Sequence, residues 1–103
     1  MRQGDSGAEK MGKPIDQIDD YLSEIGESAL VADGFDDAVI GITTAHLGND
    51  ICIVYDADRC IEILMEDDGM SYDVAVEYFD FNVAGAYVEN GPVFVVKAKN
   101  LPI

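Results

Sequence analysis

The chain has no long hydrophobic run. None of its apolar segments approaches the ~18 consecutive residues needed to cross a bilayer. The opening stretch, MRQGDSGAEKMGKP, also lacks the apolar centre of a secretion signal. We therefore expect a cytoplasmic protein with no membrane partner. At 103 residues and 49% apolar composition, the sequence predicts one globular domain.

Cysteine and histidine are scarce. Cys52 and Cys60 are too few for a disulfide scaffold and form no CxxC pair, so we interpret both as ordinary small core residues. The only histidine, His46, leaves zinc sites and two-histidine iron sites without their usual ligands. It is also the only histidine base available for nucleophilic catalysis, and no G-x-S-x-G motif accompanies it.

Positive charge is the largest shortage. Six Lys and Arg face 21 Asp and Glu, a formal net charge of −15. Between residues 14 and 96, Arg59 is the only base among 19 acids. Such a body repels nucleic acid and anionic membranes, and it attracts basic surfaces at a range that salt shortens. Glycine-rich phosphate-binding motifs are absent as well. We expect no direct nucleic-acid binding, and a protein partner with a basic surface.

The first half of the chain predicts a tail, a helix and a hairpin. Residues 1–13 show no periodicity and are predicted to be a flexible tail before a single domain over 14–103. Apolar side chains at three- and four-residue spacing predict a helix that starts at Pro14 and ends near Gly26. The β-branched segments 38–44 and 51–55, separated by a short loop, predict an antiparallel hairpin.

The second half predicts two helices and a last strand. One helix follows an N-cap at Asp56 or Asp58 and ends at Gly69, and the next follows an N-cap at Ser71. Segment 93–96 predicts a third strand. The order α-β-β-α-α-β predicts an α+β fold, with a small, mostly antiparallel three-stranded sheet and helices packed on one of its faces.

Segment 77–94, EYFDFNVAGAYVENGPVF, is interpreted as a corner of the fold. Asn82 is placed to tie down the helix exit, and Gly85 is expected to end the helix with a positive φ. Tyr87 begins an extended stretch. Because Pro92 has no N–H to close a tight turn, the loop is either wider than two residues or not a hairpin. The alternative is that Asn82 and Tyr87 line a binding surface.

The many carboxylates also raise the question of metal binding. An EF-hand loop counted from Asp56 fails, because its fifth and sixth positions are Cys60 and Ile61. Segments 33–37 and 66–69 could hold a weak divalent ion, but solvated turn and helix-end acids are the favoured interpretation. We predict no metal and no cofactor, and the enzyme alternative is a small carboxylate- or metal-dependent hydrolase.

A family resemblance covers residues 55–95, about 40% of the chain. The run GMS at 69–71, EYFDFN at 77–82, GAYV at 85–88 and a proline followed by an aromatic strand resembles a group of small proteins of bacteriophages and bacterial genomes. The loop over 89–92 departs from the Gly-Glu-x-Thr-Pro that is common in the group. The resemblance implies a phage or mobile-element setting and supplies no activity.

The resulting hypothesis is a non-enzymatic inhibitor of DNA-mimic or anti-defence type. Carboxylates along helices can imitate the phosphate spacing of duplex DNA, about one charge per 1.7 Å of axis. The alternative is an accessory or oligomeric protein whose acidity only keeps it soluble. The docking residues we expect are exposed helix acids: Asp16, Asp19, Asp20, Glu24, Asp67, Asp68, Asp73, Glu77 and Asp80.

Overall fold

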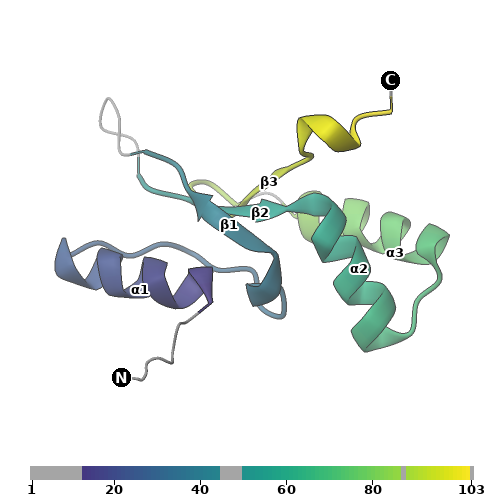
Figure 1. Cartoon of the computed structure of the whole chain (residues 1–103), viewed down its shortest axis with the longest axis horizontal. Helices are drawn as coiled ribbons and strands as arrows, with labels where there is room; N and C mark the ends of the chain where they lie inside the picture. Colours follow the sequence, from purple (N-terminus) through teal and green to yellow (C-terminus); the bar gives the residue numbers. More distant parts are fainter. Residues whose placement is uncertain (1–12, 45–49, 87, 103) are drawn as a thin grey trace.

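A computed structural model describes residues 13–44, 50–86 and 88–102 (Figure 1). Apart from Lys13, the predicted tail lies outside these residues, as do His46 and Tyr87. The helices and strands follow the predicted order, and they are α1 (Pro14–Glu24), β1 (Val39–Ile42), β2 (Ile53–Asp56), α2 (Ala57–Asp68), α3 (Tyr72–Phe79) and β3 (Val93–Val95). Short helical turns at Asp36–Ala38 and Ala98–Asn100 and a π-helical turn at Asp80–Ala84 complete the chain.

The sheet is mixed, which corrects the predicted mostly antiparallel arrangement. β1 and β2 form the expected antiparallel hairpin, with Val39 opposite Tyr55. β3 pairs with β2 in parallel, with Val54 opposite Val93. The physical reason is the connection: the chain leaves β2 through α2 and α3 and returns to run in the same direction, as a parallel pair requires. The strand order is β1-β2-β3.

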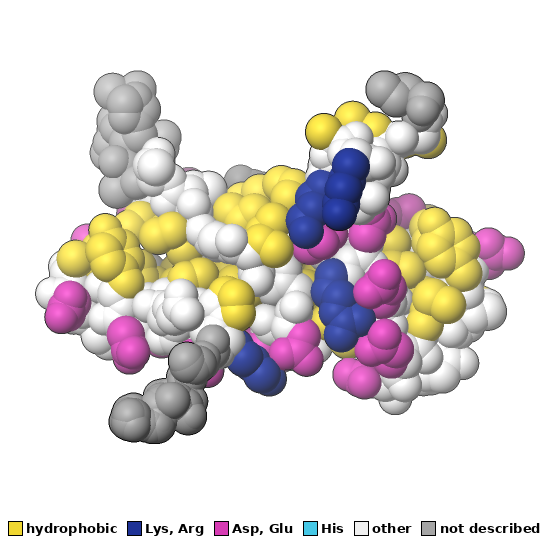
Figure 2. Space-filling model, viewed as in Figure 1, with side chains coloured by type: hydrophobic (Ala, Val, Ile, Leu, Met, Phe, Trp, Pro, Cys, Tyr) yellow, Lys and Arg dark blue, Asp and Glu magenta, His cyan; other side chains and the backbone are white. Residues whose placement is uncertain are grey.

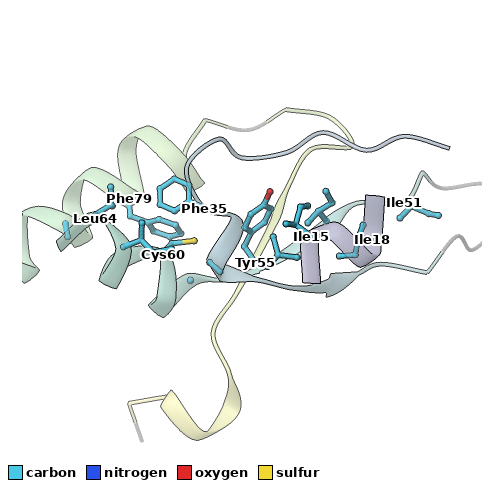
Figure 3. Packing of buried hydrophobic residues seen from close by; sticks show 14 of the residues in the cluster. Ile15, Ile18, Phe35, Ile51, Tyr55, Cys60, Leu64 and Phe79 are labelled. Carbon is cyan, nitrogen blue, oxygen red and sulfur yellow. The ribbon is translucent and has the colours of Figure 1, made fainter. Parts of the chain in front are cut away.

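The core extends along the molecule in two parts that meet at Tyr55 (Figure 3). In one part Ile15 and Ile18 of α1 pack toward the sheet. In the other, Phe35, Cys60, Leu64 and Phe79 lie among α2, α3 and the loop before β1. Tyr55 is fully buried. It joins the two parts because burial of its ring in both spares apolar surface from water.

Aromatic contacts tie β3 into this core. The Phe94 ring lies 5.4 Å from that of Tyr55 and 5.3 Å from that of Phe79, the second contact being edge-to-face. Edge-to-face pairs match the positive ring edge to the negative ring face. The Tyr55 hydroxyl accepts a 2.8 Å hydrogen bond from the Ala32 N–H, which anchors the loop between α1 and β1.

The predicted helix ends are largely confirmed. Asp56, rather than Asp58, caps α2, and its carboxylate accepts the Asp58 N–H at 3.1 Å. Gly69 closes α2 in the left-handed region at φ 70°, which costs glycine little. Ser71 caps α3 by accepting the Val74 N–H at 3.4 Å.

Gly85 was predicted wrongly. Its φ is −77°, because the chain continues past α3 in the π-helical turn instead of closing in the left-handed region. Glycine is needed here for space: a Cβ at position 85 would collide with the carbonyl oxygen of Asp80. Farther on, Asn90 adopts φ 61° in a turn closed by a 2.9 Å bond from the Gly91 N–H to the Val88 oxygen. That turn precedes a parallel strand and is not a hairpin.

Candidate binding pocket

The nine predicted docking acids are all exposed and fall into two groups. The α1 acids are Asp16, Asp19, Asp20 and Glu24. The α2–α3 acids are Asp67, Asp68, Asp73, Glu77 and Asp80. Figure 1 places α1 at one end of the molecule and α2 and α3 at the other. Figure 2 shows carboxylates at both ends, with apolar side chains and Lys or Arg between them on this face. The structure does not bring the nine together.

At the start of α1, acidic side chains have local partners. Asp16 lies in the first turn, where its carboxylate accepts the Lys13 N–H at 3.3 Å. A negative charge at this end also complements the positive end of the helix dipole. The Lys13 ammonium lies 3.1 Å from Asp37, and this hydrogen-bonded ion pair raises the pKa of Lys13. Helix stability therefore accounts for Asp16.

At the end of α2, in contrast, acidic side chains lie at the unfavourable end of the helix dipole. The last turn holds Glu66, Asp67 and Asp68 and no base. Glu66 is paired with Arg59 at 3.1 Å, and this contact, with the one to Glu62, raises the pKa of Arg59. Within the described ranges, no Lys or Arg forms an ion pair with Asp67 or Asp68. Each charge near the negative end of a helix costs about 0.3–1 kcal/mol, so stability does not account for these two aspartates.

Of the two other bases in the described part of the chain, Lys97 is also paired with a carboxylate. The Lys97 ammonium lies 3.4 Å from the carboxylate of Asp56, whose side chain is only 12% exposed. Asn100 donates a 3.0 Å hydrogen bond to Asp58, next to this pair. Of the four bases in the described part of the chain, three therefore neutralise carboxylates of the protein itself. None of these three bases is paired with the α2–α3 acids.

A pocket of about 480 Å³ lies beside Asp67 and Asp68. Five stretches line it: the loop 31–35, the second half of α2, the end of α3 with its π-helical turn, the residues Ala86, Val88 and Pro92 that follow this turn, and Phe94 of β3. Buried Phe35, Ile63 and Leu64, with half-buried Phe94, form apolar walls. Asp33, Asp67 and Asp68 are exposed lining residues, and we call them the rim acids. The site therefore combines a concave apolar surface with three negative charges.

The loop that carries Asp33 is held by a turn and by Tyr55. The Phe35 N–H bonds to the Ala32 oxygen at 3.2 Å, and Gly34 adopts φ 91°, a conformation that favours glycine. The Ala32 N–H is in turn fixed by the Tyr55 hydroxyl. Burial raises the pKa of that hydroxyl above its ordinary value, so it stays protonated at neutral pH. Asp33 is thus positioned by the core.

The pocket contains only part of what the sequence predicted. Asp67 and Asp68 line it, as does Asn82, whereas Gly85 does not. The other α2–α3 acids belong to the same end of the fold, and the α1 acids belong to the opposite end. Segments 33–37 and 66–69, each considered alone as a weak ion site, meet at this pocket. Among the residues with described positions, no three His, Cys, Asp or Glu are grouped to hold a metal ion.

Sequence reasoning missed Asp33, Tyr78 and Phe94 as site residues. Tyr78 is 42% exposed and lines the pocket. The spacing of Tyr78 along the helix places it beside the apolar face, and this spacing is the sequence signal that could have identified it. The sequence marked Asp33 only as part of a turn segment that could hold a weak ion, because its proximity to the end of α2 depends on contacts between distant segments.

The two cysteines differ. Cys60 is fully buried, and burial raises the pKa of its thiol to about 12, so it is an unreactive core residue as expected. Cys52 is only half-buried, and its N–H donates a 2.8 Å hydrogen bond to the Thr43 hydroxyl in the hairpin. Neither cysteine lines the pocket.

No helix in the described part of the chain is long and apolar enough to span a membrane. No family model matches the chain, and no curated protein or solved structure matches it significantly.

Proposed function

We propose that this chain is a small, non-enzymatic binding protein that docks on a basic, nucleic-acid-binding surface of a host protein. The observation that carries the proposal is the pair Asp67 and Asp68. They lie where the helix dipole opposes them, without an ion pair to a described base, at the edge of an apolar pocket. Charges that cost stability and have no internal partner are typical of a functional surface.

The end of the molecule that holds α2 and α3 suits docking better than α1 does. Tight protein interfaces concentrate their energy in an apolar anchor that fills a pocket, with polar groups around it. The α2–α3 acids lie at the end that holds such a pocket. The α1 acids add to the long-range attraction, which increases the rate of encounter with a basic surface.

The setting follows from the same proposal. A compact acidic protein that occupies a nucleic-acid-binding groove acts as an inhibitor of DNA-mimic or anti-defence type. A phage or mobile-element origin, implied by the resemblance over residues 55–95, fits such a role. We assign docking to Asp67, Asp68, Asp73, Glu77 and Asp80, and a supporting electrostatic role to Asp16, Asp19, Asp20 and Glu24.

The test is capture from a bacterial lysate on the immobilised protein, with duplex DNA as competitor. The proposal predicts a captured protein that duplex DNA displaces and that about 0.5 M salt releases, because screening there acts within a few ångströms. The variant Asp67→Lys, Asp73→Lys, Glu77→Lys should lose it. The matched variant Asp19→Lys, Asp20→Lys, Glu24→Lys should keep most of it. The proposal would be contradicted if the amount of captured protein were unchanged by salt, by duplex DNA and by both variants.

A further inference from the structure

We propose that the pocket receives an aromatic or aliphatic side chain flanked by arginine or lysine, from a basic segment of the partner. This inference rests on the proposed function, because it names the part of the partner that the α2–α3 end recognises. Four observations support it: the shape of the pocket, its apolar walls, the negative charge of the rim acids and the direction of the α2 helix dipole.

The shape and lining fit one anchor side chain with its neighbours. A volume of about 480 Å³ lies within the range of small-ligand and side-chain sites, about 300–1,000 Å³. Phe35, Leu64 and Phe94 present aromatic and aliphatic surface, so an apolar group gains free energy on entering. Tyr78 and Asn82 add polar atoms to the lining, which can orient a peptide.

The charge of the rim decides which apolar group is accepted. Asp33 comes from the loop before β1, whereas Asp67 and Asp68 come from the end of α2, so two separate segments bring carboxylates to one pocket. A cation beside the last turn of α2 would pair with the two aspartates and also with the negative end of the helix dipole. An anionic group would meet repulsion from both.

Two other possible occupants of the pocket fit its lining and charge less well. An apolar anion, such as a fatty-acid headgroup, would need a base among the lining residues, and the described lining holds none. A second copy of this chain would bring a net charge of −15 against the same sign, which opposes close approach. The pocket therefore favours a basic peptide segment, and the other two become outcomes of the test.

The chain has no tryptophan, which allows a direct fluorescence experiment. The probes are three blocked tripeptides: Arg-Trp-Arg, Glu-Trp-Glu and Arg-Ala-Arg. Tryptophan emission then reports only the probe, and its blue shift reports entry into an apolar site. Arg-Trp-Arg should bind with a blue shift, whereas Glu-Trp-Glu should bind at least about tenfold more weakly, a difference of ~1.4 kcal/mol. Calorimetry should show Arg-Ala-Arg to be the weaker of the two basic probes.

Two charge-matched variants separate the pocket from general attraction. The rim variant, Asp33→Asn, Asp67→Asn, Asp68→Asn, and the α1 variant, Asp19→Asn, Asp20→Asn, Glu24→Gln, each remove three negative charges. The rim variant should weaken Arg-Trp-Arg binding at least about fivefold, and the α1 variant less than about twofold. Ala84→Leu, which fills the pocket, should abolish the blue shift while the circular dichroism spectrum stays unchanged.

Each remaining outcome decides the matter. Equal binding of Glu-Trp-Glu, equal losses in both variants, or an unshifted emission would overturn the inference. Concentration-dependent sedimentation of a dimer that Ala84→Leu abolishes would assign the pocket to a second copy instead. If Ala84→Leu still captures the DNA-displaceable partner, the pocket inference fails while the proposed function stands. If Arg-Trp-Arg enters the pocket but no such partner is captured, the proposed function fails.

Discussion

The two acidic ends of this molecule carry similar side chains for different physical reasons. At the start of α1, Asp16 accepts a hydrogen bond from Lys13 and lies at the favourable end of its helix dipole. In the last turn of α2, Asp67 and Asp68 lie at the unfavourable end and border a pocket. The comparison teaches that total charge does not locate a binding surface. Charges that act against local stability beside a concavity indicate it better.

The comparison is not perfectly symmetric. Glu24 also lies in the last turn of its helix, which holds no base. It is not among the residues that line the pocket. One opposed charge at the end of an exposed helix costs only a few tenths of a kcal/mol after screening. What distinguishes the α2–α3 end is that charges opposed by the helix dipole lie beside an apolar cavity. Among the described residues, only this end combines the two features.

The largest expected loss of stability comes from truncating a buried core side chain at either end of the molecule. Phe79→Ala removes a buried ring and its edge-to-face contact with Phe94, and we expect a loss of about 3–5 kcal/mol. Leu22→Ala, on the α1 side, should cost about 2–5 kcal/mol. Because Tyr55 joins the two parts of the core, urea unfolding should remain one transition in both variants. Separate melting of the α1 end would show that the two ends are independent.

The next effect is local to the pocket end. Gly85→Ala should cost about 1–3 kcal/mol, because the new methyl group meets the Asp80 carbonyl in the π-helical turn that carries Asn82. Gly41→Ala in β1 is the control, since a Cβ there meets nothing within 4 Å, and it should be neutral or stabilise by up to about 1 kcal/mol. Equal costs in urea denaturation would refute the special role of position 85.

Alkaline pH should weaken the fold through the buried thiol at the pocket end. The pKa of Cys60 is raised to about 12 by burial, whereas an unfolded-state thiol loses its proton near ~8.5. The unfolded state therefore binds fewer protons in that interval, so stability is complete below about pH 8.5 and falls as pH rises toward 12. The raised pKa of Tyr55 acts in the same direction.

The measurement is urea denaturation under reducing conditions at several pH values between about 8 and 11. Each such group contributes a slope of up to about 1.4 kcal/mol per pH unit. Cys60→Ala should make the decline shallower, although it lowers stability at neutral pH by leaving a small cavity. An unchanged slope in this variant would show that the thiol titrates alike in both states.

The smallest effects compare the two helix ends directly. Asp67→Asn and Asp68→Asn should each stabilise the protein by about 0.3–1 kcal/mol, because they remove charges that the α2 dipole opposes. Asp16→Asn should destabilise it by a similar amount, since the first turn of α1 loses a favourable charge. Thermal melts at low ionic strength give the signs. A change of stability with the same sign at both helix ends would contradict the proposed difference between the α1 and α2 acids.

Much of the fold was predictable because its determinants are local. The spacing of Ile15, Ile18 and Leu22 predicts α1, the short loop after β1 predicts the hairpin, and Asp56, Gly69 and Ser71 mark helix ends. The direction of β3 was not predictable, because its partner strand lies about 40 residues earlier and the intervening helices decide how the chain returns.

The site was predictable only in part. Asp67 and Asp68 stand out in the sequence as acids at a helix end, and Asn82 stands out within its corner. Asp33 joins them through the fold, because the loop whose Ala32 N–H bonds to the Tyr55 hydroxyl lines the same pocket as the end of α2. The role of Gly85 depends on a π-helical turn that no single residue announces. Contacts between segments that are distant in sequence thus account for the difference between the predicted docking residues and the lining of the pocket.

Docking at the pocket end, rather than along α1, can be tested by mapping peptide binding residue by residue on the protein. Backbone amide NMR signals of the wild-type chain would be followed while the blocked Arg-Trp-Arg peptide is added at low ionic strength. We expect saturable shifts at the pocket, in Gly34, Leu64, Asn82 and their neighbours, and only small shifts along α1. Shifts that spread equally over both acidic ends, or that concentrate on α1, would contradict it.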